Sequence, residues 1–190
     1  MPFDFASPWT GASPGFKLHP LLNGELPRKD FFFDLAAPNF TPVRLSGTGQ
    51  SMFLSDDELR TPATNPPIMH MCIMHDAFPQ WPIDIALQYN TYTPTLAPPI
   101  TLGDVLYMIH ASLHRQISHR DWAQIDVAQE TAISRAYTRR YRSVPSRAKA
   151  EANQGVKRVD YLLERHIFRG LVRAQSRDGV SHWQLITRST

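Results

Sequence analysis

The sequence predicts an α+β domain, with an antiparallel or mixed β-sheet, helices packed on one face of it, and a closing C-terminal β-hairpin. Fifteen of the 16 prolines lie before residue 100. Since proline fixes φ and lacks an amide donor, the first half favours loops and short strands over long helices. Apolar residues at helical spacing begin only after residue 100, and two apolar runs around a glycine turn end the chain. The regular β–α alternation of a doubly wound nucleotide fold is missing.

Short strands and turns account for most of the first half. Prolines and charged residues bound each apolar run, so we expect strands over residues 31–35, 43–46, 68–75 and 83–89. Ser55 and Glu58 fit a capping box and predict a single helical turn. The proline-rich segment 61–67 is expected to be a rigid loop.

Helices dominate the second half. Thr101 is the expected N-cap of the first helix, whose apolar residues form one stripe toward the core: Leu102, Val105, Leu106, Ile109, Leu113 and Ile117. Ser118 and Asp121 predict a second, short helix by the same capping pattern. A longer helix is predicted over residues 127–142, with Ile133, Tyr137 and Tyr141 buried.

The end of the chain predicts a linker, a short helix and a hairpin. Residues 146–156 are polar and read as a linker, and residues 159–165 as a short helix. The hairpin pairs residues 168–175 with 180–187 around the turn at 176–179, with Trp183 and Leu185 on one face. We expect residues 1–17 to be a flexible arm and residues 18–190 to form a single domain, a size that one core supports.

Composition and cysteine usage favour an intracellular protein. Apolar residues make up 42% of the chain, which is enough for a core without metals or disulfides. Cys72 is the only cysteine, as is typical of a reducing compartment. The first residues do not resemble a secretory signal, and no apolar run is long enough for a membrane span. We therefore expect a cytoplasmic or nuclear protein that has no membrane partner.

Charge is divided unevenly along the chain. Residues 1–100 contain 5 Lys and Arg against 9 Asp and Glu, and residues 101–190 contain 15 against 8, so the halves carry −4 and +7. A basic C-terminal half is compatible with an acidic partner such as another protein or a nucleic acid. It is equally compatible with an ordinary solvated helix surface.

Several short motifs, in order, resemble a fungal family known as a domain of unknown function and abundant in mushroom-forming basidiomycetes. The motifs are Leu18-His19-Pro20-Leu21-Leu22, Pro62-Ala63-Thr64-Asn65-Pro66-Pro67, Thr101-Leu102-Gly103-Asp104-Val105-Leu106, Gly155-Val156-Lys157-Arg158-Val159-Asp160-Tyr161-Leu162 and Trp183-Gln184-Leu185. The resemblance covers residues 18–187. It implies a single domain in a fungal, intracellular setting, and it implies no activity, cofactor or site residue.

No catalytic or cofactor motif is present. Two groups of residues suggest a metal site, but each group also has a simpler structural explanation. His110 and His114 stand four residues apart on a predicted helix, but a zinc protease motif would need Glu where Ala111 stands. Half-buried, hydrogen-bonded histidines explain the pair more simply than metal ligands do. His70, Cys72 and Met74 would share one strand face as soft ligands, although such residues are also ordinary core residues. We therefore expect no cofactor.

A basic stretch gives the remaining candidate site. Arg135, Arg139 and Arg142 would line one side of the helix predicted at 127–142, where their guanidinium groups could bind anions. The sequence thus favours a non-enzymatic intracellular protein-interaction domain. The first alternative is phosphate or nucleic-acid binding through the basic helix around residues 135–149. The second is an enzyme or metal protein whose site assembles from dispersed residues such as His110, His114, Asp104 and Asp160.

Overall fold

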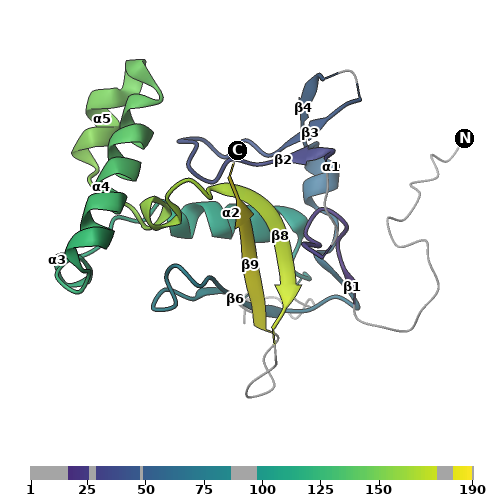
Figure 1. Ribbon diagram of the computed structural model, residues 1–190. Coiled ribbons are helices and arrows are strands. Elements are labelled where there is room, and N and C mark those ends of the chain that lie inside the picture. Colours follow the sequence, from purple (N-terminus) through teal and green to yellow (C-terminus); the bar gives the residue numbers. More distant parts are fainter. Residues whose placement is uncertain (1–16, 26–28, 48, 87–97, 175–181, 190) are drawn as a thin grey trace, which may run out of the picture.

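The computed structural model describes residues 17–25, 29–47, 49–86, 98–174 and 182–189. It confirms the α+β class, with mixed sheet pairing and a C-terminal hairpin. In Figure 1 the main sheet crosses the centre of the molecule, a group of helices stands at one end, and a small sheet stands at the other. No helix among the described residues is both long and apolar enough to cross a bilayer.

The main sheet has four strands in the order β7-β6-β9-β8. Strand β6 (His70–Met74) pairs antiparallel with β7 (Ile83–Ala86) and parallel with β9 (His182–Arg188). Strand β9 in turn forms the predicted hairpin with β8 (Ile167–Arg173). Because β6 and β9 come from opposite halves of the chain, their pairing joins both halves in one sheet. Residues 87–89 and the hairpin turn at 176–179 lie outside the described residues.

Helix α2 (Leu102–Leu113) packs against the sheet and supplies the centre of the core. The capping box between Thr101 and Asp104 starts it as the sequence predicts, with Asp104 N donating to Thr101 Oγ1 over 3.1 Å. In Figure 1 the helix passes behind β8 and β9. Its fully buried side chains are Leu102, Val105, Leu106, Ile109 and Leu113, which meet sheet residues such as Met71, Ile73, Trp183 and Leu185.

Two small sheets and one helical turn complete the first half. Their elements are β1 (Lys17–Leu18), β2 (Phe31–Phe32), β3 (Val43–Leu45), β4 (Ser51–Phe53), α1 (Asp56–Leu59) and β5 (Thr64–Asn65). Strand β1 pairs with β5, so the expected loop at 61–67 contains a short strand. Of the expected flexible arm, residues 1–16 lie outside the described residues and Lys17 belongs to β1.

The strand predicted over residues 31–35 ends early. Strand β2 stops at Phe32, and the next residues leave β3 and bond to the segment around β8 instead. Phe168 N donates to the Phe33 carbonyl oxygen and Leu35 N donates to the His166 carbonyl oxygen, each over 2.9 Å. Residues 33–35 therefore connect the small sheet to the main one.

Helices and 3₁₀ turns fill the segment between the core helix and the hairpin. They are α3 (His119–Trp122), α4 (Val127–Arg142), η1 (Pro145–Arg147), α5 (Ala148–Asn153) and η2 (Arg158–Leu162). Helix α4 has the predicted bounds. The predicted linker at 146–156 was wrong, because alanine-rich α5 packs on α4, where Tyr137 Oη donates to the Ala152 carbonyl oxygen over 2.8 Å.

Candidate functional site: the two sides of helix α4

Helix α4 is started by its own sequence and held by its inner side. Asp126 is the N-cap, and its carboxylate accepts a hydrogen bond from Gln129 N over 2.8 Å. Ile133, Ala136 and Arg140 are buried along the inner side. Tyr137 and Tyr141, which were expected in the core, are only half-buried. The side chain that is buried in this part of the helix is Arg140 instead.

The Arg140 guanidinium is the centre of a buried ionic cluster, and its side chain is only 4% exposed. Its Nε and one terminal nitrogen donate to the two oxygens of Asp160 over 2.8 and 2.9 Å. Its other hydrogen bonds are with Glu151 Oε2 at 2.9 Å and the Gly155 carbonyl oxygen at 3.0 Å. One side chain thereby ties α4 to α5 and η2, with the fork geometry that arginine forms with carboxylates.

Lys157 is the second buried cation of this cluster. Its Nζ donates to Glu151 Oε2 over 3.0 Å and lies 3.5 Å from His114 Nδ1. Burial alone would raise the pKa of the Glu151 carboxyl, but the hydrogen bond and charge of Lys157, together with the charge of Arg140, lower it. Glu151 and Asp160 therefore balance Arg140 and Lys157, which makes the cluster a structural frame for α4.

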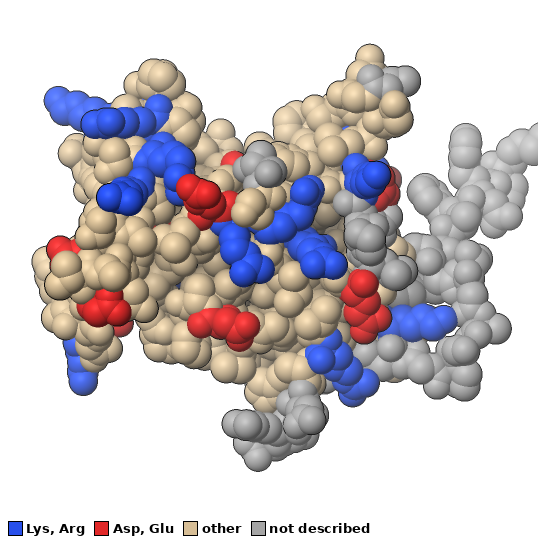
Figure 2. Space-filling model, viewed as in Figure 1, with Lys and Arg blue, Asp and Glu red and all other residues tan. Residues whose placement is uncertain are grey.

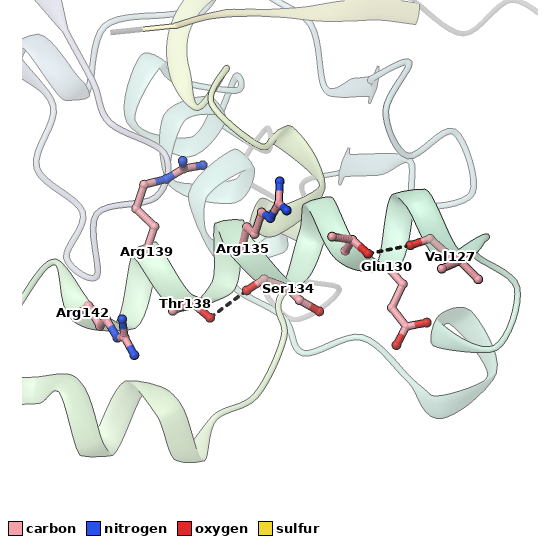
Figure 3. Close-up of a pocket in the computed structure, with 8 residues that line it drawn as sticks. Val127, Glu130, Ser134, Arg135, Thr138, Arg139 and Arg142 are labelled. Atoms are coloured by element: carbon pink, nitrogen blue, oxygen red, sulfur yellow. Dashed lines mark hydrogen bonds between the residues drawn. The ribbon is translucent and has the colours of Figure 1, made fainter.

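The outer side of α4 carries a strip of small residues: Val127, Thr131, Ser134 and Thr138. It forms the floor of a shallow, open depression of about 670 Å³ (Figure 3). Val127, the first residue of the helix, is 80% exposed. The hydroxyls of Thr131 and Thr138 donate within the helix, to the carbonyl oxygens four residues earlier. We call these four residues the small-residue strip.

Three arginines border this strip, and they are the residues that the sequence offered as candidates for anion binding. In Figure 3 Arg135 and Arg139 project from one side of α4, Arg142 lies near its C-terminal end, and Glu130 projects from the opposite side. Spacings of four and three residues place the three arginines along one stretch of the helix, but the Arg142 side chain turns toward Tyr141, to the side on which Glu130 projects. Glu130 is the only carboxylate among the described residues that border the depression. We call Arg135, Arg139 and Arg142 the arginine row.

Contacts differ along the arginine row. Arg139 donates to Glu164 Oε1 over 3.2 Å and to the Leu163 carbonyl oxygen over 3.3 Å. The guanidinium carbon of Arg142 lies 5.7 Å from the centre of the Tyr141 ring. Arg135 has no hydrogen bond or ion pair within the described part of the chain. Figure 2 shows blue side chains gathered over the α4–α5 end of the molecule and again over β8 and β9.

His110 and His114 come together but bond to backbone rather than facing open space. Their rings stack with centres 4.1 Å apart. His110 Nε2 lies 2.9 Å from the Ala37 carbonyl oxygen and His114 Nε2 lies 3.0 Å from that of Leu35, so both Nε2 atoms are the N–H donors. Burial lowers the pKa of His114 to about 4, and the charges of His110 and Lys157 act in the same direction.

The dispersed residues of the enzyme hypothesis serve separate contacts. Asp104 caps α2, and Asp160 pairs with Arg140. Within the described ranges, no three His, Cys, Asp or Glu side chains are arranged to hold a metal ion. On β6, Met71 and Ile73 face the core while His70 and Met74 are exposed. Burial, followed by a hydrogen bond to Asp84, raises the pKa of the Cys72 thiol to about 11, so this thiol is not a nucleophile at neutral pH.

Sequence reasoning missed a histidine–carboxylate pair beside α4. His166 Nδ1 donates to Asp34 Oδ1 over 2.7 Å, and both residues line a cavity of about 90 Å³ together with Arg139 and Ser143. Burial would raise the pKa of Asp34, but the bonds from His166 and from Ala36 N lower it. Ser143 Oγ donates to the Arg140 carbonyl oxygen, so its proton is not directed at His166. No sequence signal links positions 34 and 166, because the pairing depends on residues 33–35 turning toward β8.

These features define an α+β domain with one basic helix that is anchored on its inner side and uncovered, among the described residues, on its outer side. The chain belongs to a family described as "Family of unknown function (DUF6699)", whose model matches residues 31–179. No curated protein and no solved structure matches the chain.

Proposed function

We propose that this chain is a non-enzymatic protein-interaction domain and that the outer side of α4 is its binding surface. The observation that carries the proposal is the combination of the small-residue strip with the arginine row on one uncovered helix surface. Binding surfaces between proteins are enriched in arginine, and the short side chains of the strip let a partner approach the helix closely.

The frame beneath the surface supports this function. A helix that offers its outer side to a partner has to be held by its inner side, and the Arg140 cluster does so with bonds of 2.8 to 3.0 Å. Such anchoring lowers the entropy that association would otherwise cost. The buried cluster and the exposed arginine row therefore have complementary roles on one helix.

Nucleic-acid binding through the same arginines is the alternative, and two residues weigh against it. Glu130 borders the same depression and would repel a phosphate backbone. Val127, 80% exposed at the start of the strip, offers contact area to an apolar side chain and none to a phosphate. A protein segment uses both kinds of group.

A photo-crosslinking experiment tests the proposal. Benzoylphenylalanine placed at Thr131, on the strip, should give adducts in cell extract that protease destroys and nuclease leaves intact. The same group placed at Asp57, exposed on α1, is the matched control and should give none of these adducts. Replacing the arginine row by alanine should abolish the Thr131 adducts. Adducts that are nuclease-sensitive, or equal at both positions, would refute the proposal.

The proposal also covers where in the cell the interaction takes place. We place the domain in the cytoplasm or nucleus of a fungal cell, on the strength of the single cysteine and of the motifs near Leu18, Pro62, Thr101 and Gly155. A fluorescent fusion that entered the secretory pathway would contradict this placement.

A further inference from the structure

The outer side of α4 has the dimensions of a helix-binding surface. The helix has 16 residues and is about 24 Å long at 1.5 Å per residue, and the strip from Val127 to Thr138 covers about 17 Å of it. Its central residues are small, so a second helix could approach to the roughly 8–10 Å axis separation of packed helices. A β-strand could not pair with this surface, because the backbone amides of α4 beyond its first turn already donate to carbonyl oxygens within the helix.

Charges on this surface are placed asymmetrically along its length. The arginine row occupies the C-terminal half, with spacings of four and three residues, and Glu130 stands in the N-terminal half on the side opposite Arg135 and Arg139. A matching partner therefore needs carboxylates along one half of its length and a cation near the other end. A helix with acidic residues in its own first half is favoured by its dipole. Such a helix matches α4 only if it runs antiparallel.

From this placement, and resting on the proposed function, we infer that the partner contributes an amphipathic α-helix whose first half is acidic. It lies antiparallel along the small-residue strip, and its carboxylates meet Arg135, Arg139 and Arg142. Small or apolar residues at its centre contact Thr131 and Thr138, and a basic residue in its second half faces Glu130.

The arginine row is partly ordered for this contact before binding. Arg139 is held by Glu164 and the Leu163 carbonyl oxygen, and Arg142 lies over Tyr141. Side chains that are already restricted lose less rotamer entropy when a partner binds. Arg135, which has no such contact among the described residues, lies between Thr131 and Thr138 along the helix, and its exposed side chain can turn toward an incoming carboxylate.

A second copy of this surface does not fit the inference. Each copy contributes three arginines against two glutamates, Glu130 and the Glu164 that pairs with Arg139, so two copies placed face to face still bring together a net positive charge. Like charges across an interface oppose association. The partner is therefore a different acidic segment.

Three probes of equal length test the inference by fluorescence anisotropy with the full chain. The first is a 20-residue peptide with a leucine and alanine stripe, glutamates in its first half and lysines in its second. The next has the same composition with the glutamates in its second half. The third has the sequence of the first except for two central prolines, which break the helix. A single-stranded DNA oligonucleotide of 12 nucleotides is measured beside them.

We expect the first peptide to bind at least tenfold more tightly than the reversed and the proline-containing peptides, and than the oligonucleotide. The triple variant R135A/R139A/R142A should lose at least tenfold in affinity for it, and Thr138→Trp should do the same by blocking close approach. The control variant R120A/R169A/R188A removes the same charge from exposed positions elsewhere and should bind as the natural chain does.

Each other outcome has a defined meaning. Equal binding of the proline-containing peptide refutes the helical partner but leaves the proposed interaction function standing, since an extended acidic segment would then suffice. Equal binding of the reversed peptide refutes the antiparallel orientation. Failure of all three peptides refutes the inference, whereas the Thr131 crosslinks decide the proposed function separately. Tighter binding of the oligonucleotide refutes both.

Discussion

Arg140 and Arg135 are the same residue type on the same helix, five positions apart, and they have opposite surroundings. Arg140 is buried between two carboxylates, and Arg135 is exposed on the outer side without an ionic partner among the described residues. A buried guanidinium is tolerated only with its charge balanced and its donors used, whereas an exposed one contributes little to stability and remains available. Position on the helix, rather than residue type, therefore separates a structural arginine from a candidate binding one.

Removing the buried arginine should give the largest effect. Arg140→Met leaves Asp160 buried without its guanidinium partner, and Glu151 keeps only Lys157. Breaking such a buried ion pair lowers the free energy of unfolding by on the order of 3–5 kcal/mol. The measurement is urea denaturation followed by circular dichroism, with Arg135→Met as the matched control on the outer side. An Arg140→Met variant as stable as the control would show that the cluster does not hold α4.

A second large effect should appear with pH on the inner side. His114 is neutral in the fold with a pKa near 4, while the unfolded chain protonates it near 6.5, and burial lowers the pKa of His110 as well. The unfolded state therefore binds more protons between these values, so stability is complete above about pH 6.5 and falls as the pH drops toward 4. For His114 alone the loss is roughly 2–3 kcal/mol.

Denaturation curves between pH 4 and 7 measure this loss, and His114→Gln should flatten the dependence. His75 also has a lowered pKa, from burial, but it lies after β6 and is bonded to Thr187 of β9 rather than to the segment at residues 35–37. His75→Gln is therefore the control for histidine burial in general. A pH dependence that is unchanged by His114→Gln would mean that this histidine titrates normally.

A smaller effect separates the α4–α5 contact from the ionic cluster. Tyr137→Phe removes only the hydroxyl that donates to the Ala152 carbonyl oxygen over 2.8 Å. The expected loss is about 1 kcal/mol, the usual net contribution of one hydrogen bond. Tyr141→Phe, on the same helix and likewise half-buried, is the matched control. Equal effects of the two substitutions would assign the loss to ring packing instead of the bond.

The sequence predicted the features that depend on interactions between neighbouring residues, and it missed those that depend on contacts between distant segments. The bounds of α4 and the caps at Ser55, Thr101 and Ser118 were predictable, because capping and helical spacing are local. The arginine row was predictable for the same reason, since spacings of four and three residues place side chains on one side of a helix.

Contacts between distant segments were not predictable in this way. The parallel pairing of β6 with β9 and the bond between Asp34 and His166 join residues more than 100 positions apart. Arg140 did carry a usable signal, because it stands four residues after Ala136 and seven after Ile133, at an inward position. An arginine at such a position requires buried carboxylates, but nothing local says that Glu151 and Asp160 supply them.

The smallest change in stability is expected at the exposed arginines of the outer side. Alanine at Arg135, Arg139 or Arg142 should change the free energy of unfolding by less than about 0.5–1 kcal/mol, since exposed ion pairs such as Arg139 with Glu164 contribute little. The same denaturation series, run at 50 and 500 mM salt, should show no larger dependence for Arg139→Ala than for Arg120→Ala. A loss above 2 kcal/mol at any of the three would mean that the row supports the fold. The proposal that the outer arginines serve a partner would then lose its support, because stability alone would account for them.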